Sequence, residues 1–142
     1  MSQDPALCSA AGTRALVLAF VRAFNGGDNA ALNRLWAGQG AAYTPGFRWY
    51  TAFQDEPPIE HQVFSRARLL PYFATRHRRG ERLRILGFRF NGNGGNGYGN
   101  LEYRLKRTAT DLDASSQRYD GKGALVCSPG RRALAVWSMG TV

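Results

Sequence analysis

Three residues in the middle of the chain carry side chains that could together perform acid–base chemistry. Asp55, Glu56 and His61 lie close together in the sequence, around the Pro57-Pro58 pair. A carboxylate beside an imidazole can take a proton from a bound molecule and return it, provided that the two groups meet and their pKa values are shifted. If the chain is an enzyme, we predict Asp55 and His61 as its catalytic residues.

Aromatic residues, most of them with polar tips, form a second candidate site. Such side chains combine an apolar body with a hydrogen-bonding group, as the walls of small-molecule pockets often do. Large aromatics also dominate ordinary cores, so the sequence leaves both interpretations open. The predicted ligand pocket comprises Phe20, Tyr43, Trp49, Tyr50, Tyr103 and Tyr119.

Two further motifs match known sites only in their letters. Residues 92–97 spell the dinucleotide fingerprint, but that motif must lead from a strand into a helix, and here strand-like segments flank it on both sides. This context favours a hairpin loop. Asp111 and Asp113 lack the glycine and the final glutamate of a calcium loop, and neither His61 nor His77 has a partner at metal-ligand spacing. We predict no metal and no cofactor.

The composition is strongly basic. The 142 residues carry a net charge of +9, and only Lys106 and Lys122 among the 19 basic residues are lysines. A series of arginines could bind phosphate groups, but no recognised nucleic-acid motif accompanies it. We therefore expect no nucleic-acid partner. The series comprises Arg66, Arg68, Arg76, Arg78, Arg79, Arg82 and Arg84.

The cysteines and the lengths of the apolar segments indicate the cellular compartment of the protein. Two cysteines are too few for a disulfide framework, so we expect Cys127 to be a small core residue and Cys8 to lie in a loose terminus. No apolar run approaches the roughly 20 residues of a membrane span, and the first residues lack the pattern of a signal peptide. We predict a cytoplasmic protein with no membrane contact.

The elements that must position these residues begin with a pair of helices. Apolar residues recur at the helical period between Ala15 and Phe24 and again between Leu32 and Trp36. Gly26 or Gly27 can close the first helix in the left-handed conformation, and Asp28 can accept a backbone N–H at the start of the second. The two helices therefore present apolar faces to the same place.

A third helix and a sheet complete the predicted fold. The helix extends from a cap at Ser65 to the arginines before Gly80, with Pro71 either beginning or bending it. Alternation of apolar and polar residues predicts strands over residues 81–90, 98–110, 118–127 and 132–140. We predict an α+β cone in which three N-terminal helices pack on a curved antiparallel sheet of four to six strands, with residues 1–12 a loose terminus and 13–142 one domain.

This order of elements, with the segments FVRAFNGGDNAALNRLW, LLPYFATRHRRGE and YDGKGALVC…AVWSMG, resembles the nuclear transport factor 2-like superfamily, in particular its SnoaL-like branch. The resemblance implies a sheet wrapped round the helices, a cavity open at one end, and a homodimer through the outer sheet face. Members include steroid isomerases, polyketide cyclases, epoxide hydrolases, dehydratases and non-catalytic domains. The fold alone therefore indicates no activity.

The functional residues of the steroid isomerases in this superfamily have no counterparts here. Their phenol donor on the first helix matches Phe20, and their carboxylate base matches the Tyr43-Thr44 pair before Pro45. Their second acidic donor falls in the segment GKGALVC, which contains no acid. Because proton abstraction beside a carbonyl needs both a base and a stabiliser, the resemblance does not imply isomerase activity.

Three hypotheses follow from the sequence. The leading one is a cavity domain that binds a small, largely apolar organic molecule. The second is a hydrolase, cyclase or dehydratase that uses Asp55 and His61 at the mouth of the pocket. The third is a non-catalytic, dimeric interaction domain.

Overall fold

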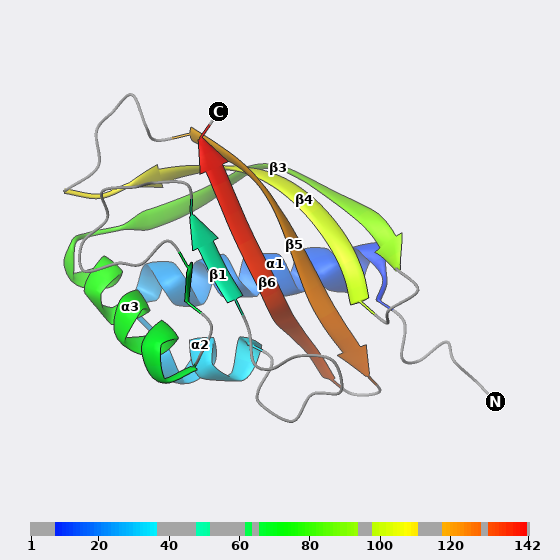
Figure 1. Cartoon of the computed structure of the whole chain (residues 1–142), viewed down its shortest axis with the longest axis horizontal. Coiled ribbons are helices and arrows are strands. Elements are labelled where there is room, and N and C mark those ends of the chain that lie inside the picture. The colour runs from blue at the N-terminus through cyan, green and yellow to red at the C-terminus, as the bar shows by residue number, and fades with distance from the viewer. Residues whose placement is uncertain are drawn as a thin grey trace.

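The computed structural model describes residues 8–36, 48–51, 62–63, 66–93, 98–110, 118–128 and 131–141. Three helices lie against one side of a curved sheet (Figure 1), which confirms the predicted α+β class. The helices are α1 (Ala10–Gly26), α2 (Asn29–Leu35) and α3 (Arg66–Arg78). The strands are β1 (Arg48–Thr51), β2 (Gln62–Val63), β3 (Arg82–Asn93), β4 (Tyr98–Thr108), β5 (Arg118–Ser128) and β6 (Arg131–Thr141).

The six strands form one sheet in the order β2-β1-β6-β5-β4-β3. The pairs β1–β2, β3–β4, β4–β5 and β5–β6 are antiparallel, which confirms the predicted antiparallel sheet for these pairs. The exception is the pairing of β1 with β6, which is parallel. It arises because β1 lies between α2 and α3 in the chain and joins the edge of the last strand, with Trp49 in register with Trp137.

The turn between α1 and α2 has the predicted chemistry. Gly27 closes α1 with a φ of 66°, and the Asp28 side chain accepts a hydrogen bond from the Ala31 N–H at 3.1 Å. The start of α1 differs from the prediction, because the Ser9 hydroxyl accepts from the Gly12 N–H at 3.0 Å and the helix begins at Ala10. The predicted loose terminus of residues 1–12 is therefore too long, and residues 1–7 lie outside the described chain.

Cys127 lies in the core as predicted, but the expectation that Cys8 belongs to a loose terminus is wrong. Cys8 and Cys127 are both buried and form a disulfide that joins the residue before Ser9 to β5. Asn93 holds the same segment, since its side-chain amide donates to the Cys8 carbonyl and accepts from the Cys8 N–H, each at 2.9 Å. A Cβ atom at Gly99 would lie 2.7 Å from the Cys8 sulfur, so glycine leaves the room that this approach needs.

A second asparagine fixes the C-terminal end of α1 to β3, the strand that also contains Asn93. The Asn25 side chain accepts from the Leu83 N–H at 2.7 Å and donates to the Leu83 carbonyl at 2.9 Å. Two asparagine side chains, one from the helix and one from the strand, therefore hold α1 along β3.

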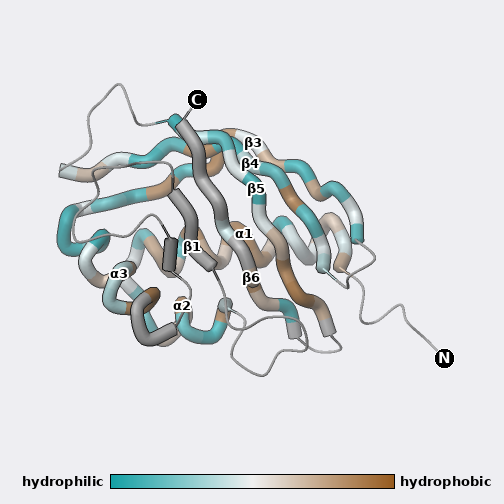
Figure 2. The backbone as a smooth tube through the Cα atoms, viewed as in Figure 1, coloured by the Kyte–Doolittle hydropathy of each residue, from teal (hydrophilic) through white to brown (hydrophobic). Residues whose placement is uncertain are grey.

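The strands alternate in character between their two faces. Figure 2 shows hydrophilic and hydrophobic residues following one another along β3, β4 and β5. In β4, Leu101, Tyr103 and Leu105 are buried toward the helices, whereas Glu102 and Arg104 lie on the outer face. Burial of apolar surface drives this arrangement, so the inner face forms the core and the outer face remains available for contact with other molecules.

Candidate functional site

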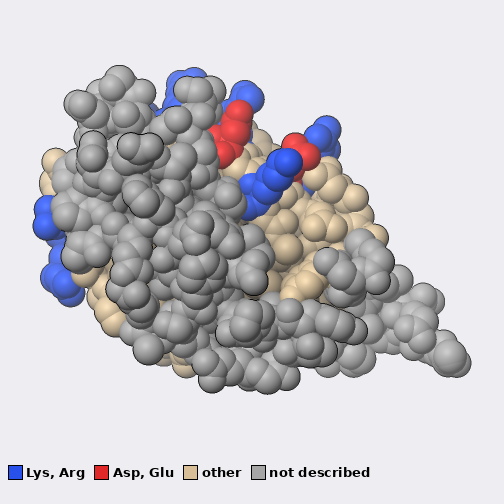
Figure 3. All heavy atoms as spheres, viewed as in Figure 1, with Lys and Arg blue, Asp and Glu red and all other residues tan. Residues whose placement is uncertain are grey.

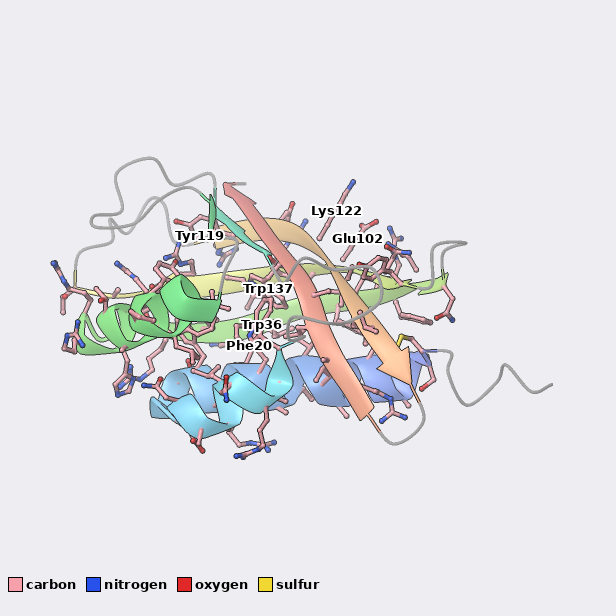
Figure 4. The ribbon with its side chains drawn as sticks, turned by 60° about the horizontal axis from the view of Figure 1, so that its bottom comes forward. Phe20, Trp36, Glu102, Tyr119, Lys122 and Trp137 are labelled. Atoms are coloured by element: carbon pink, nitrogen blue, oxygen red, sulfur yellow. A yellow bond between two sulfur atoms is a disulfide. The ribbon has the colours of Figure 1, made fainter. Side chains whose placement is uncertain are left out.

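The described members of the predicted aromatic pocket lie in a packed core. Phe20 is fully buried, with its ring centroid 4.9 Å from that of Trp137 and 5.6 Å from that of Trp36. Tyr103 stacks on Trp137 with centroids 4.0 Å apart, and Tyr119 is fully buried. Figure 4 shows Phe20, Trp36 and Trp137 together between the helices and the sheet. In the described part of the chain these side chains belong to the buried hydrophobic core.

The other predicted site residues are not placed relative to this core. Tyr43, Asp55 and His61 lie outside the described residues. The backbone of Trp49 and Tyr50 belongs to β1, where Trp49 pairs with Trp137 of β6. The catalytic role of Asp55 and His61, and the pocket role of the aromatic residues, stay predictions.

A small cavity lies on the inner side, between α1 and β3. Its volume is about 80 Å³, and it is lined by Arg14, Val17, Leu18, Ile85 and Phe88. Sites for drug-sized ligands usually measure about 300–1,000 Å³. This cavity is therefore too small for such a ligand.

The buried ionisable residues of the inner side hold one another. Glu81 accepts hydrogen bonds from Arg107 at 2.6 and 3.0 Å and also pairs with the Arg76 guanidinium, and all three side chains are fully buried. The Arg107 guanidinium also lies over the Tyr119 ring, 5.1 Å from its centroid. Because the carboxylate is engaged by two cations, the group connects α3 to β4 and is a structural cluster.

A hollow lies on the outer face of β3, β4 and β5. It has a volume of about 610 Å³ and includes Leu86, Gly87 and Gly121 in its lining. Acidic and basic side chains project beside this hollowed surface in Figure 3, and Figure 4 shows Glu102 and Lys122 pointing away from the helices. The charged lining residues are Arg89, Glu102, Arg104, Asp120 and Lys122.

Both acids of the hollow are engaged by neighbours on adjacent strands. Glu102 accepts from Asn91 at 2.8 Å and from Arg89 at 3.0 Å, and Asp120 accepts from Arg104 at 2.8 Å. The hydrogen bond from Asn91 and the charge of Arg89 lower the pKa of Glu102. The outer face therefore carries fixed charge at neutral pH, in an open site that water can enter.

A row of basic residues adjoins this hollow. Arg84, Lys106 and Arg118 are cross-strand neighbours on β3, β4 and β5. None of the three has an acidic partner in the described part of the chain. Alternation along each strand already places them on the polar face, but only the register brings them side by side, and the sequence does not specify that register.

The described arginines of the series between Arg66 and Arg84 have different partners. Arg76 is buried against Glu81, and Arg78 donates to the Thr75 hydroxyl at 3.0 Å. Arg82 donates to the Glu81 carbonyl at 2.8 Å, which leaves Arg84 as the member of the series that joins the basic row. The described arginines of the series therefore lie in different surroundings on α3 and β3 and do not form one surface.

The remaining motifs have structural explanations where they are described. Gly92 and Asn93 end β3, and Asn93 pairs with Gly99 of β4, so the glycine-rich segment connects two antiparallel strands. The hairpin prediction is confirmed, and residues 94–97 lie outside the described chain. His77 is half-buried against Gly27, where a Cβ atom would lie 2.7 Å from its Nε2. Among the described helices, none is long and apolar enough to cross a membrane.

The fold resembles many solved structures of very different sequence. A dehydratase candidate of the nuclear transport factor 2-like family from Streptomyces avermitilis has a TM-score of 0.69 and 15% identity, over 92% of this chain and 93% of that one. A protein of unknown function with a cystatin-like fold from Nostoc punctiforme has a TM-score of 0.68 and 13% identity, over 94% and 93% of the two chains.

A third similar structure is named as an association domain. It is a candidate calcium/calmodulin-dependent protein kinase II association domain from Xanthomonas campestris, with a TM-score of 0.67 and 12% identity, over 95% of this chain and 89% of that one. No family model matches the sequence. No curated protein matches it either. At these identities the likeness shows the fold, which is the nuclear transport factor 2-like fold predicted from the sequence.

Proposed function

We propose that this nuclear transport factor 2-like fold serves as a non-catalytic interaction domain whose binding surface is the outer face of β3, β4 and β5. One observation carries the proposal. In the described part of the chain, a hollow of about 610 Å³ lies on the outer face, whereas Phe20, Tyr103 and Tyr119 are packed into the core. A binding surface needs exposed groups, and the charged side chains of the outer face supply them.

The chemistry of the described residues supports a binding role over a catalytic one. Glu81, the acid buried among the described residues, is held by Arg76 and Arg107 and does not line the cavity between α1 and β3. On the outer face, Glu102 and Asp120 are paired in an open site, which lacks the exclusion of water that strengthens acid–base catalysis. The fold likeness to the X. campestris association domain agrees with such a role.

Site-specific photo-crosslinking tests the proposal with a matched pair of positions. Leu86 and Leu18 are the exposed large hydrophobic residues of the described chain, at 38% and 39% exposure. Leu86 borders the outer hollow, and Leu18 lies on α1. We expect benzoylphenylalanine at position 86 to give a discrete crosslinked product in cells, and the same residue at position 18 to give none. Equal products from both positions, or none from position 86, would overturn the proposal.

A small-molecule function is the second candidate, and the aromatic floor of the cone supports it. Tyr103 and Trp137 stack at 4.0 Å, and β1, which contains Trp49 and Tyr50, joins the sheet beside Trp137. An apolar ligand could rest on such a floor if the residues at the mouth of the cone leave room for it. The name of the S. avermitilis protein, a dehydratase candidate, fits this alternative.

Thermal-shift measurements with small aromatic carbonyl compounds test the second candidate. A bound compound raises the melting temperature of the wild type, and Trp49→Ala abolishes this increase. If the site is catalytic, Asp55→Asn and His61→Gln abolish turnover and leave the thermal shift in place. The absence of stabilisation by any compound of this class would rule out the small-molecule function in the form proposed.

A further inference from the structure

The basic row on the outer face has no structural explanation in the fold. Arg84 pairs in register with Lys106, and Lys106 pairs with Arg118. Neighbouring strands lie about 4.8 Å apart, so these three cations project side by side. Like charges directly opposite one another destabilise a sheet. No acid within the described residues lies within ion-pair distance of these three cations, so the row is open to an anionic ligand.

The excess of positive charge extends beyond this row. Both acids of the face, Glu102 and Asp120, already accept hydrogen bonds from arginines, whereas Lys122 has no acid within ion-pair distance in the described chain. The net charge of +9 adds a long-range attraction for anions. The basic residues of the face are Arg82, Arg84, Arg89, Arg104, Lys106, Arg118 and Lys122.

We propose that this basic row, defined as Arg84, Lys106 and Arg118, binds an acidic segment of a partner protein together with the adjoining hollow. The proposal rests on the interaction role proposed above and names the class of partner. An extended peptide projects every second side chain to one side, which lets successive carboxylates meet cations on neighbouring strands. The hollow of about 610 Å³ accommodates the peptide backbone, and exposed Leu86 offers an apolar contact.

Two other occupants fit the observations less well. A nucleic-acid backbone would place its phosphates near the carboxylates of Glu102 and Asp120, which would repel them. A second copy of this chain would bring the same basic row toward an interface that is already positive, and like charges across an interface are repulsive. An acidic polypeptide complements the row without either conflict.

Fluorescence anisotropy with labelled oligoglutamate tests the proposal on the full chain. We expect binding at low ionic strength that weakens as salt is added, because the contacts are exposed ion pairs. Lys106→Glu reverses the central charge of the basic row and should weaken binding about tenfold or more. Arg22→Glu is the control, because it makes a charge reversal at an exposed site on α1 and should leave the affinity unchanged.

Stability measurements separate loss of binding from loss of folding. Lys106→Glu replaces like-charge contacts with opposite-charge contacts to Arg84 and Arg118, so the variant should melt at or above the wild-type temperature. Equal weakening by Lys106→Glu and Arg22→Glu would overturn the basic row as the site. Unchanged affinity in Lys106→Glu would do the same.

The remaining outcomes identify a different occupant. If duplex DNA or heparin binds more tightly than oligoglutamate and competes with it, the surface recognises polyanions generally and the proposed partner class is wrong. If light scattering shows a dimer that Lys106→Glu dissociates, a second copy is the occupant. If oligoglutamate does not bind but position 86 still gives a crosslinked product, the proposed acidic partner is wrong, and the proposed role as an interaction domain is retained. If oligoglutamate does not bind and position 86 gives no crosslinked product, both proposals are wrong.

Discussion

Two adjacent residues of β4 show how differently the two faces of this sheet are built. Tyr103 points inward and stacks on Trp137, and burial raises its pKa well above the usual value. Glu102 points outward, and the hydrogen bond from Asn91 and the charge of Arg89 lower its pKa. One strand therefore contributes a closed apolar layer and an open charged surface. The outer face of these strands is therefore a candidate functional surface distinct from the core.

The largest difference between the faces should appear when one acid is removed from each. Glu81→Ala removes the carboxylate that Arg76 and Arg107 share in the core, and we expect it to lower the free energy of unfolding by about 3–5 kcal/mol. Glu102→Ala on the outer face should have a small effect, because water replaces the lost contacts. Urea unfolding of both variants measures the contrast. An equal decrease in the free energy of unfolding for both variants would contradict the distinction between a buried ion-pair cluster and an exposed one.

Packing gives a second large contrast. Trp137→Ala removes the ring that contacts both Phe20 and Tyr103, and it should destabilise the chain by about 3–5 kcal/mol. Lys122→Ala, on the outer face, should change stability by no more than about 0.5 kcal/mol. Chemical denaturation checks both values. A loss below about 1 kcal/mol for Trp137→Ala would indicate a loosely packed inner face with room for a ligand.

The disulfide should contribute an intermediate amount. Cys127→Ser opens a link between positions 119 residues apart in sequence and should reduce the free energy of unfolding by about 2–4 kcal/mol. Reduction of the wild type should have the same effect. Alkylation followed by mass spectrometry on protein from its native source determines whether the thiols are free. Free thiols there would mean that the bond does not form in the cell, as expected for the predicted cytoplasmic location.

On the outer face one substitution should have the opposite sign. Lys106→Glu should raise the free energy of unfolding by about 0.2–1 kcal/mol, because it replaces repulsion from Arg84 and Arg118 with attraction. Arg22→Glu on α1 should have no comparable benefit. Parallel thermal melts of the two variants provide the test. Destabilisation by Lys106→Glu would show that the row is not repulsive in the folded chain.

The smallest expected difference between the two faces is in how the stability of the chain depends on pH. The lowered pKa of Glu102 gives stability that is present above its unfolded value of about 4.3 and is lost as pH falls through the folded value. The raised pKa of Tyr103 gives stability that is complete below about pH 10 and is lost as pH rises above it. Melting curves of Glu102→Gln and Tyr103→Phe should lose the acidic and alkaline dependence respectively. Unchanged curves would contradict both assignments.

Much of the fold could be predicted from local patterns in the sequence. The helix-closing Gly27 and the capping Asp28 are adjacent, so their chemistry is visible without tertiary structure. The alternation in β4 was equally local and correctly divided Tyr103 from Glu102. The same alternation places Arg107 on the inner face, which is a sequence signal for its buried pairing with Glu81.

The features that escaped prediction depend on distant partners. The Cys8–Cys127 disulfide and the parallel pairing of β1 with β6 join segments from opposite parts of the chain. The basic row requires the registers of two strand pairs, and a shift of one residue would place its members on opposite faces. Asp55 and His61 lie outside the described residues, so their meeting stays a prediction.

An NMR titration of the full chain with oligoglutamate tests whether the chain binds through the outer face and leaves the described core unchanged. We expect chemical-shift changes at the backbone amides of Arg84, Lys106 and Arg118 and in the adjoining hollow at Gly87 and Gly121. We expect none at Phe20 or at the indole of Trp137. Shifts concentrated on the inner face, or no shifts on the outer face, would contradict binding through the outer face.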